Sequence, residues 1–325
     1  MKEEPILNAL KNRPGAFVSG EEMSRLVGVS RTAIWKEIEK LREEGYQILA
    51  QPHLGYRLMG IPDRLTPQEL SWTLNTQRIG RRIHAYNLTD STMNVAHRLA
   101  GAGEPDGTVV VAEGQFKGRG RLSRSWISPK GKGIYLSVIL RPEVPLFQVP
   151  LVTLMAAVAV AKGIREATGL QPEIKWPNDL LLKMKKVAGI LTELNGELNR
   201  VNYIVLGIGV NVNARRSDLP GQATSLSEEL SHPVDRIRSA RILLTELDRS
   251  YAKFLAGESE SILQEWRRFA SFLGRPIRVA VQGKTIDGQA LDIDSRGTLL
   301  VRTDAGLMES ISAGEVLIVH SGKGR

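Results

Sequence analysis

Apolar residues recur at helical spacing in three short segments of the first sixty residues, at positions 6–10, 20–27 and 31–44. Spacings of three and four residues place such side chains on one face, so each segment is predicted to be a helix with a buried stripe. Ser30 suits the N-cap of the third helix, because its side-chain oxygen can accept a hydrogen bond from a free backbone amide. Gly45 ends that helix, whose apolar positions are Ala33, Ile34, Ile38 and Leu41.

Two short β-runs follow the third predicted helix. Residues 46–50 and 55–58 are separated by the turn Gln51-Pro52-His53-Leu54, which predicts a small hairpin or wing. Residues 60–63, Gly-Ile-Pro-Asp, form the predicted linker. Residues 1–62 are therefore predicted to form a winged helix-turn-helix DNA-binding domain.

Between residues 63 and 273, β-runs and helical segments alternate without a regular strand–helix–strand rhythm. The runs between Asp179 and Glu193 are joined by short turns and must be antiparallel, because a parallel pair needs a crossover of roughly a dozen residues. The pattern thus predicts an α+β domain with a mixed sheet and argues against a Rossmann fold. The predicted strands are 83–87, 108–112, 134–140, 173–176, 180–182, 187–194 and 203–212, and the predicted helices are 92–99, 151–167 and 234–255.

The last fifty residues change to short β-runs separated by glycine-containing turns. The turns Gln282-Gly283, Ser295-Arg296-Gly297 and Asp304-Ala305-Gly306 recur at the spacing of a small β-barrel. Residues 274–325 are therefore predicted to form a separate C-terminal β-barrel domain.

Composition narrows the functional classes. The net charge of +9 favours an anionic partner or substrate but does not distinguish DNA from a nucleotide. The absence of cysteine excludes disulfides, thiolate metal sites and cysteine nucleophiles, and fits a reducing compartment. The charged N-terminus does not resemble a signal peptide, and the apolar stretch 151–161 is far shorter than the roughly 20 residues that span a bilayer. We expect a soluble cytoplasmic protein with no membrane partner.

A basic glycine-rich loop occupies residues 114–133, GQFKGRGRLSRSWISPKGKG, and contains no acidic residue. Gly118 and Gly120 allow the backbone to approach a ligand closely, and the arginines supply forked donors that match phosphate or carboxylate oxygens. Repulsion among its cations predicts a loop that becomes ordered when an anion binds. The alternative is a solvated basic loop. The spacing fits neither a P-loop nor a dinucleotide fingerprint.

Five further motifs accompany this loop in order along the chain. They are Asp90-Ser91-Thr92, Gln115, Lys175-Trp176-Pro177-Asn178-Asp179, Lys186-Val187-Ala188-Gly189-Ile190-Leu191 and Gly207-Ile208-Gly209-Val210-Asn211. With the GRGR run, the helix-turn-helix in front and the β-barrel behind, the whole chain resembles the bifunctional biotin protein ligases that also repress the biotin operon. The resemblance implies a class II synthetase-like biotin/lipoate ligase fold and a C-terminal SH3-like barrel.

The resemblance implies a site for biotin beside the loop. An apolar bicycle with a polar ureido group requires apolar walls and a few hydrogen-bonding groups. Helix capping is the alternative role for Ser91 and Thr92. Met93 stands where many relatives carry asparagine, which puts a ligand contact there in doubt. The biotin-binding residues implied are Ser91, Thr92, Met93, Gln115, Arg119, Gly120, Arg121 and Lys186.

Activation of the biotin carboxylate requires cations between it and the α-phosphate of ATP. The resemblance assigns this catalytic role to Lys186, with Arg121, although Lys183, Lys185 and Lys186 form a run of a kind that usually faces solvent. It implies nucleotide contacts from Arg121, Arg124, Trp126, Lys175, Asn178 and Asn211.

Two nucleotide contributions are less defined. Mg²⁺ is expected with ATP, and its ligands stay open: Asp179 is one candidate, but a turn aspartate before a strand is at least as often structural. The C-terminal stretch 310–314, Ser-Ile-Ser-Ala-Gly, lacks the arginine expected near the nucleotide.

The implied product is biotin joined to a lysine of the biotin carboxyl carrier protein of acetyl-CoA carboxylase. In the N-terminal domain, the third helix would place Ser30, Arg31, Thr32 and Lys36 in the major groove of operator DNA. A palindromic operator implies a homodimer. The alternative functions are a lipoate- or octanoate-type ligase and a ligand-sensing transcription factor without enzymatic activity.

Overall fold

The computed structural model describes residues 3–197, 200–281 and 283–318, which form two compact units, residues 1–64 and 65–325. The first boundary lies two residues beyond the one predicted from the sequence. The division of the larger unit at residue 273 stays a prediction. Residues 319–325 of the predicted barrel domain lie outside the described residues.

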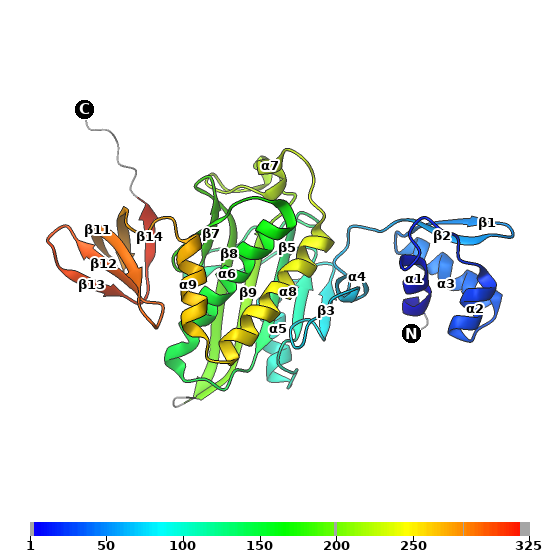
Figure 1. Cartoon of the computed structure of the whole chain (residues 1–325), viewed down its shortest axis with the longest axis horizontal. Helices are drawn as coiled ribbons and strands as arrows, with labels where there is room; N and C mark the ends of the chain where they lie inside the picture. The colour runs from blue at the N-terminus through cyan, green and yellow to red at the C-terminus, as the bar shows by residue number, and fades with distance from the viewer. Residues whose placement is uncertain (1–2, 198–199, 282, 319–325) are drawn as a thin grey trace. The chain divides into compact units, whose positions relative to one another are not determined.

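The N-terminal unit contains three helices and a hairpin around one apolar core (Figure 1). The Ser30 side chain caps the third helix by accepting a hydrogen bond from the Ala33 amide at 3.2 Å. The predicted helices and wing are confirmed. The elements are α1 (Glu3–Lys11), α2 (Gly20–Val27), α3 (Arg31–Glu43), β1 (Gln47–Gln51) and β2 (Gly55–Gly60).

The centre of the larger unit is a seven-stranded sheet in the order β3-β4-β5-β9-β8-β7-β6. β3 and β4 are parallel, and the other neighbouring pairs are antiparallel, which confirms the predicted mixed sheet. The strands are β3 (Ile83–Tyr86), β4 (Val109–Ala112), β5 (Gly133–Leu140), β6 (Glu173–Lys175), β7 (Asp179–Leu182), β8 (Lys185–Glu197) and β9 (Arg200–Asn211).

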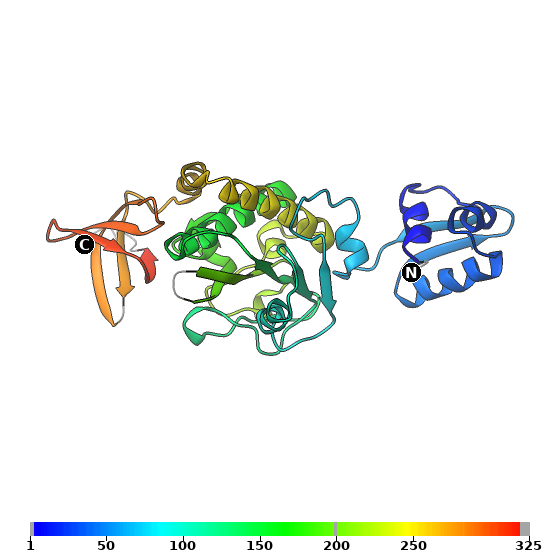
Figure 2. The same ribbon diagram turned by 90° about the horizontal axis from the view of Figure 1, so that it is seen from below.

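Helices cover both faces of this sheet. α6 (Val149–Thr168), α8 (Arg236–Leu255) and α9 (Ser259–Phe269) lie on one face, and α5 (Thr92–Gly101) lies on the other (Figures 1 and 2). α8 begins two residues later than predicted, because Asp235 caps it by accepting a hydrogen bond from the Arg238 amide at 2.9 Å. The short helices are α4 (Pro67–Ser71) and α7 (Leu226–Leu230).

The segment Leu146–Thr168, which contains α6, is long and apolar enough to cross a membrane by length and composition. The sequence argument considered only residues 151–161, which are fewer than the 23 residues of this segment. α6 packs against α8, α9 and the sheet, and twelve of its twenty residues are buried. This burial identifies it as the core helix of the unit.

The C-terminal strands form a five-stranded antiparallel sheet in the order β13-β12-β11-β10-β14. Its buried residues Ile277, Val279 and Val316 belong to the same apolar cluster as α6 and the central sheet. The Trp176 indole N–H also donates to the Gly297 carbonyl at 3.0 Å. The strands are β10 (Pro276–Val281), β11 (Lys284–Ile293), β12 (Leu299–Thr303), β13 (Met308–Ile311) and β14 (Glu315–Ile318).

Candidate active site

A pocket lies on the α5 side of the central sheet, where Gly189 of β8 and Gly207 and Gly209 of β9 carry no side chain. On β9, Leu206 and Ile208 belong to the core cluster under α6, so Gly207 and Gly209 face the other way. A Cβ at Gly207 would lie 2.5 Å from the Met93 sulfur, and one at Gly209 would lie 2.5 Å from the Trp126 indole. Glycine at both positions therefore makes the room for the pocket.

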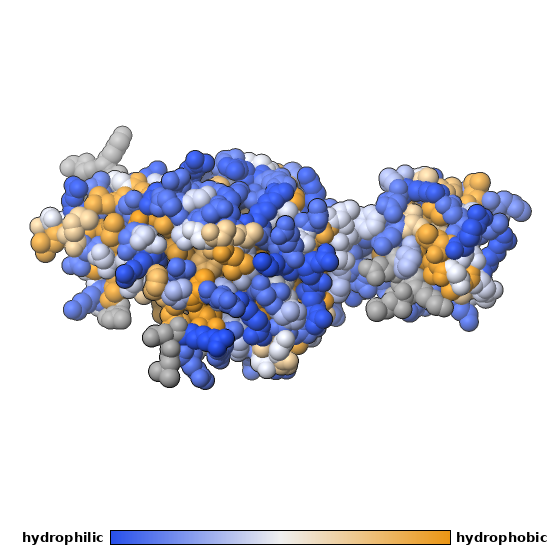
Figure 3. Space-filling view, turned by 60° about the horizontal axis from the view of Figure 1, so that its bottom comes forward, coloured by the Kyte–Doolittle hydropathy of each residue, from blue (hydrophilic) through white to orange (hydrophobic). Residues whose placement is uncertain are grey.

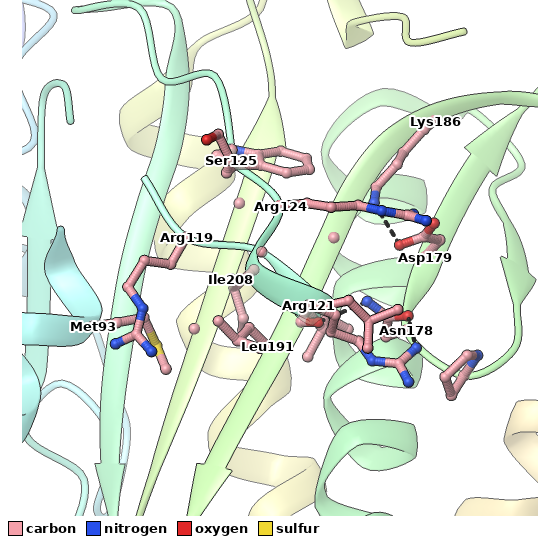
Figure 4. A pocket seen from close by; sticks show the side chains of 18 of the residues that line it. Met93, Arg119, Arg121, Arg124, Ser125, Asn178, Asp179, Lys186, Leu191 and Ile208 are labelled. Atoms are coloured by element: carbon pink, nitrogen blue, oxygen red, sulfur yellow. Dashed lines mark hydrogen bonds and ion pairs between the residues drawn. The ribbon is translucent and has the colours of Figure 1, made fainter. Parts of the chain in front are cut away.

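The pocket gathers residues that are widely separated in the sequence (Figure 4). Met93 and Arg119 lie at one end and Lys186 and Asp179 at the other, with Leu191 between them (Figure 4). The predicted residues that line it are Ser91, Thr92, Met93, Gln115, Arg119, Gly120, Arg121, Arg124, Trp126, Lys175, Asn178, Asp179 and Lys186.

Buried polar groups meet beside the start of α5. The Gln115 side-chain oxygen accepts hydrogen bonds from the Thr92 amide at 2.8 Å and the Thr92 hydroxyl at 3.1 Å. The Ser137 hydroxyl donates to the Thr92 oxygen at 2.8 Å. The Ser91 oxygen caps α5 by accepting from the Met93 amide at 3.3 Å. Ser91 thus lines the pocket and caps the helix, so the two roles considered for it coexist.

Met93 forms an apolar part of the wall. Its side chain is buried and packs with Val205 and Leu191 in the cluster under α5. A thioether at this position supplies apolar contact and no hydrogen-bonding amide. The next residue, Asn94, is directed elsewhere and donates to the Asp90 carboxylate at 2.7 Å.

Two arginines of the basic loop have protein partners. Arg119 donates to Asn94 Oδ1 at 3.0 Å and to Glu193 Oε1 at 2.5 Å. Arg121 donates to Asn178 Oδ1 at 2.9 Å and to the Gly314 carbonyl at 3.4 Å. Burial lowers the pKa of the Arg121 guanidinium, against the opposing influence of nearby carboxylates. These contacts fix the loop over the pocket.

Arg124 is held by a carboxylate from the C-terminal sheet. Its Nη1 and Nη2 donate to Glu315 Oε1 and Oε2 at 3.0 and 2.7 Å. The hydrogen bond from Arg124 is the largest cause that holds the pKa of the Glu315 carboxyl below its usual value. Glu315 itself lines the pocket. The sequence interpretation missed this residue, because it looked for an arginine in the preceding turn.

Lys186 is the second residue of β8, and its side chain lines the pocket. Its Nζ lies 2.6 Å from Asp179 Oδ1 and 5.4 Å from the centre of the Trp126 ring. The neighbouring lysines differ: Lys183 pairs with Glu229, and Lys185 lines an adjacent groove. Lys186 therefore lines the pocket, and a register shift between β7 and β8 turns it away from the core face of Val187 and Ala188.

The Trp126 side chain lies across the glycine floor. The ring lies against Gly189 and Gly209, and its buried Nε1–H has no hydrogen-bond partner in the described part of the chain. An unsatisfied buried N–H costs about 1–3 kcal/mol, so an acceptor that reached it would be favoured.

The exposed face of α3 carries the residues predicted to contact DNA. Arg31, Thr32 and Lys36 are exposed, and Arg31 Nη2 lies 3.0 Å from the Glu21 carboxylate. Ser30 is committed to capping α3. Trp35 shares this face with 52% of its surface exposed, which excludes a core role.

Comparison with known proteins identifies the family. A family model described as "Biotin/lipoate A/B protein ligase family" matches residues 85–211, and models of an HTH domain and of a biotin protein ligase C-terminal domain match residues 2–57 and 272–319. The bifunctional ligase/repressor BirA of Bacillus subtilis (strain 168) is 42% identical over 301 residues, which cover 91% of this chain and 93% of that protein. The chain belongs to the bifunctional biotin ligase/repressor family.

Other members of this family and a solved ligase agree with the assignment. The bifunctional ligase/repressor BirA of Escherichia coli (strain K12) is 32% identical and is matched over 93% of each chain. The biotin protein ligase from Aquifex aeolicus, solved in complex with biotin and ATP, has a TM-score of 0.64 at 29% identity and covers 74% of this chain and 100% of that chain. The predicted family and fold class are thereby confirmed.

The predicted nucleotide residue Asn211 does not line the pocket, whereas the metal candidate Asp179 lines it with a partner already in place. Asn211 is buried, and its amide donates to the Thr224 carbonyl at 3.0 Å, away from the residues that line the pocket. For Asp179, the Lys186 ammonium is already a partner. Within the described ranges there is no group of three or more histidine, aspartate or glutamate residues that could enclose a metal ion.

Proposed function

We propose that this chain joins biotin to AMP and then transfers biotin to a lysine of a carrier protein. The observation that supports this most directly is the convergence of Lys186 with Arg119, Arg121 and Arg124 of the basic loop on one glycine-floored pocket. The Mycobacterium tuberculosis relative is named a biotin--[acetyl-CoA-carboxylase] ligase, and the Aquifex aeolicus ligase was solved with biotin and ATP.

The proposed first step joins two anions. A biotin carboxylate oxygen attacks the α-phosphorus of ATP, the bond to the β-phosphate breaks, and pyrophosphate leaves. Lys186 would bridge the carboxylate and the α-phosphate, and Arg121 would share the developing charge, which is positioning and electrostatic stabilisation. Their present partners, Asp179 and Asn178, keep both side chains directed at the pocket until substrates replace them.

The two ends of the pocket suit the two ends of biotin. The polar groups of Ser91, Thr92 and Gln115 would bind the ureido group, and Met93 and Leu191 would contact the bicycle. Gly120 gives the loop its close approach, and Arg119 would cover this end. The opposite end, with Lys186, would then hold the carboxylate.

The nucleotide would lie along the second arm of the loop. We propose that Arg124 and Lys175 bind phosphates and that Trp126 packs over the adenylate. Asn178 would contact the same nucleotide. Asn211 stays a candidate that would have to exchange its hydrogen bond to Thr224 for one to the base.

Mg²⁺ fits this pocket as an ion carried by the nucleotide rather than enclosed by protein. Mg²⁺ usually keeps several waters and binds one or two carboxylates together with substrate phosphates. Asp179 is the carboxylate next to Lys186 and would serve as such a ligand. The ion would supply charge screening of the phosphates when bound.

The proposed second step transfers biotin to protein. The amine of a lysine on the biotin carboxyl carrier protein of acetyl-CoA carboxylase attacks the carbonyl carbon of biotinyl-AMP, AMP leaves, and an amide forms. Closure of the loop over the mixed anhydride would exclude water. We place both steps in the cytoplasm, and neither requires a membrane.

The direct test is transfer of labelled biotin to a biotin carboxyl carrier protein with ATP and Mg²⁺. We expect incorporation into the carrier and pyrophosphate release that depends on biotin. Lipoate and octanoate in parallel reactions distinguish a ligase of the other specificity. A protein that binds biotin without releasing pyrophosphate would be a ligand sensor and not an enzyme.

Biotin and ATP together are expected to protect the basic loop from trypsin. Substrates bound beneath the loop would bind Arg121 and Arg124 and hold the loop closed, so cleavage within residues 114–133 should slow by about tenfold or more, in proportion to the closed fraction. Mass spectrometry of the fragments locates the cuts. Cleavage at the same rate with and without ligands would contradict closure.

We propose that the N-terminal unit represses biotin synthesis genes by binding their operators. Arg31→Ala should weaken binding to promoter DNA of those genes from its own genome by about tenfold, because a base contact is worth about 1–3 kcal/mol. Fluorescence anisotropy measures the affinity, and Arg302→Ala, an exposed arginine of β12, controls for net charge. Equal losses in both variants would exclude a specific contact.

We further propose a homodimer whose formation biotinyl-AMP favours, because two helix-turn-helix units match a palindromic operator. Sedimentation velocity with biotin and ATP should show a larger dimer fraction than without them. Such coupling requires different adenylate affinities of monomer and dimer. An unchanged dimer fraction would show that ligand binding does not control dimerisation, and so does not control repression through it.

A further inference from the structure

Side chains of α5 and β8 form a holder for the guanidinium of Arg119. Asn94 Oδ1 accepts from Arg119 Nη1 at 3.0 Å, and Glu193 accepts from Nη2 through Oε1. The second carboxylate oxygen of Glu193, Oε2, lies 2.9 Å from His97 Nε2. A carboxylate only accepts, so this imidazole nitrogen carries the proton and donates.

The holder is built on rigid elements. Asn94 and His97 are three residues apart on α5 and therefore share one helix face. Glu193 follows Gly189 and Leu191 on alternate positions of β8, so it lies on the pocket side of the sheet. The His97 ring also packs against Tyr203 of β9, 5.8 Å between ring centres. Asn94, His97 and Glu193 are thus held in place by α5 and β8 and not by a ligand.

We propose that Glu193, oriented by His97, is a positioning residue that fixes Arg119 and with it the first arm of the basic loop over the biotin end of the pocket. This inference rests on the proposed function. The backbone beside Arg119 is paired with the second arm of the loop, because Gly120 N–H donates to Arg124 O at 2.8 Å and Trp126 N–H donates to Gly118 O at 2.9 Å. The two arms therefore move together, and the Arg119 side chain ties them to α5 and β8 at the biotin end of the pocket.

The geometry predicts which kinetic constant Glu193 controls. Arg119 lies at the Met93 end of the pocket, whereas Lys186 and Asp179 lie at the other end (Figure 4). Loss of the anchor should weaken biotin binding and leave the chemistry at Lys186 intact. The effect should therefore fall on the KM for biotin, with kcat preserved at saturating biotin.

The test uses the full chain and the assay of biotin-dependent pyrophosphate release. The glutamine of Glu193→Gln has one oxygen that accepts and one amide group that donates. Arg119 and His97 both donate, so the glutamine can accept from only one of them and the other contact is lost. We expect the KM for biotin to rise about 3- to 30-fold, less than for a fully buried hydrogen bond to a charged group, because solvent screens this partly exposed pair. Glu197→Gln, the same change at the exposed end of β8, should leave it unchanged.

Two histidine variants separate positioning from a general structural role. His97→Ala should raise the KM for biotin, as Glu193→Gln does. His97→Gln keeps a side-chain donor, so it should retain most of the wild-type affinity for biotin. Trypsin cleavage after Arg119 in the presence of biotin should accelerate in Glu193→Gln and His97→Ala. All variants should keep the wild-type melting temperature within about 3 °C, the scale of a surface contact.

The outcomes are distinct from those that test the proposed function. Wild-type protein that releases no pyrophosphate with biotin would refute that function. Active wild-type protein with a Glu193→Gln variant that matches Glu197→Gln in KM and in cleavage would refute the positioning role. A fall in kcat at unchanged KM would refute it as well.

Discussion

Lys186→Ala is expected to slow biotinyl-AMP formation by about 100- to 1,000-fold while the fold stays intact. In the proposed mechanism Lys186 bridges the biotin carboxylate and the α-phosphate, and in the structure its Nζ lies 2.6 Å from the Asp179 carboxylate. About a third of its side chain is exposed, so its removal leaves no large cavity. Biotin-dependent exchange of labelled pyrophosphate into ATP measures the step.

Lys185→Ala is the matched control for this variant. It removes the same charge from the neighbouring residue of the same strand, at an exposed position in the adjacent groove. We expect its exchange rate to stay within about threefold of wild type, the scale of a screened charge. Near-normal exchange by Lys186→Ala would remove this lysine from the mechanism.

Glu113→Gln is expected to destabilise the larger unit by about 3–5 kcal/mol, because it breaks a buried ion pair. Arg236 is fully buried and pairs with Glu113 at 2.8 Å. The Glu113 carboxylate also accepts the Leu65 amide at 2.5 Å, and Arg236 donates to the Gly133 carbonyl at 3.0 Å. Urea unfolding followed by tryptophan fluorescence reports mainly this unit, since all tryptophans except Trp35 lie in it.

An exposed pair provides the comparison. Arg278 and Asp287 form a two-point ion pair on the C-terminal sheet, with about half of each side chain exposed. Arg278→Met should move the urea midpoint far less than Glu113→Gln, because solvent screens exposed pairs. Similar shifts in the two variants would show that burial of the Glu113–Arg236 pair does not control the stability of this unit.

The sequence predicted the elements whose pattern is local. Helix spacing and caps located α3, and short turns required the antiparallel arrangement of β7 and β8. The helix α9 was omitted from the prediction, although Ile262, Leu263 and Trp266 recur at helical spacing and are buried. The pocket-facing direction of Lys186 does not follow from strand alternation, which would place it on the core face of Ala188 and Ile190. A register shift in the pairing of β7 with β8 moves Lys186 to the other face, and the sequence pattern does not show that shift.

The partners of the cations could not be predicted from the sequence. Glu315 lies 191 residues from Arg124, and Glu193 lies 74 residues from Arg119, so only the tertiary fold brings them together. The basic loop contains no acid, which led to an expectation of self-repulsion. The folded chain supplies the missing charges from other elements.

Because Arg124 and Lys186 already have carboxylate partners, the arrival of anionic substrates exchanges one set of negative neighbours for another. Little uncompensated charge is created or removed in such an exchange. Dissolved ions screen the contacts that are lost as well as those that are formed, so a change in ionic strength should change substrate affinity little. DNA binding, which releases counterions from phosphates, would respond to the same change far more steeply.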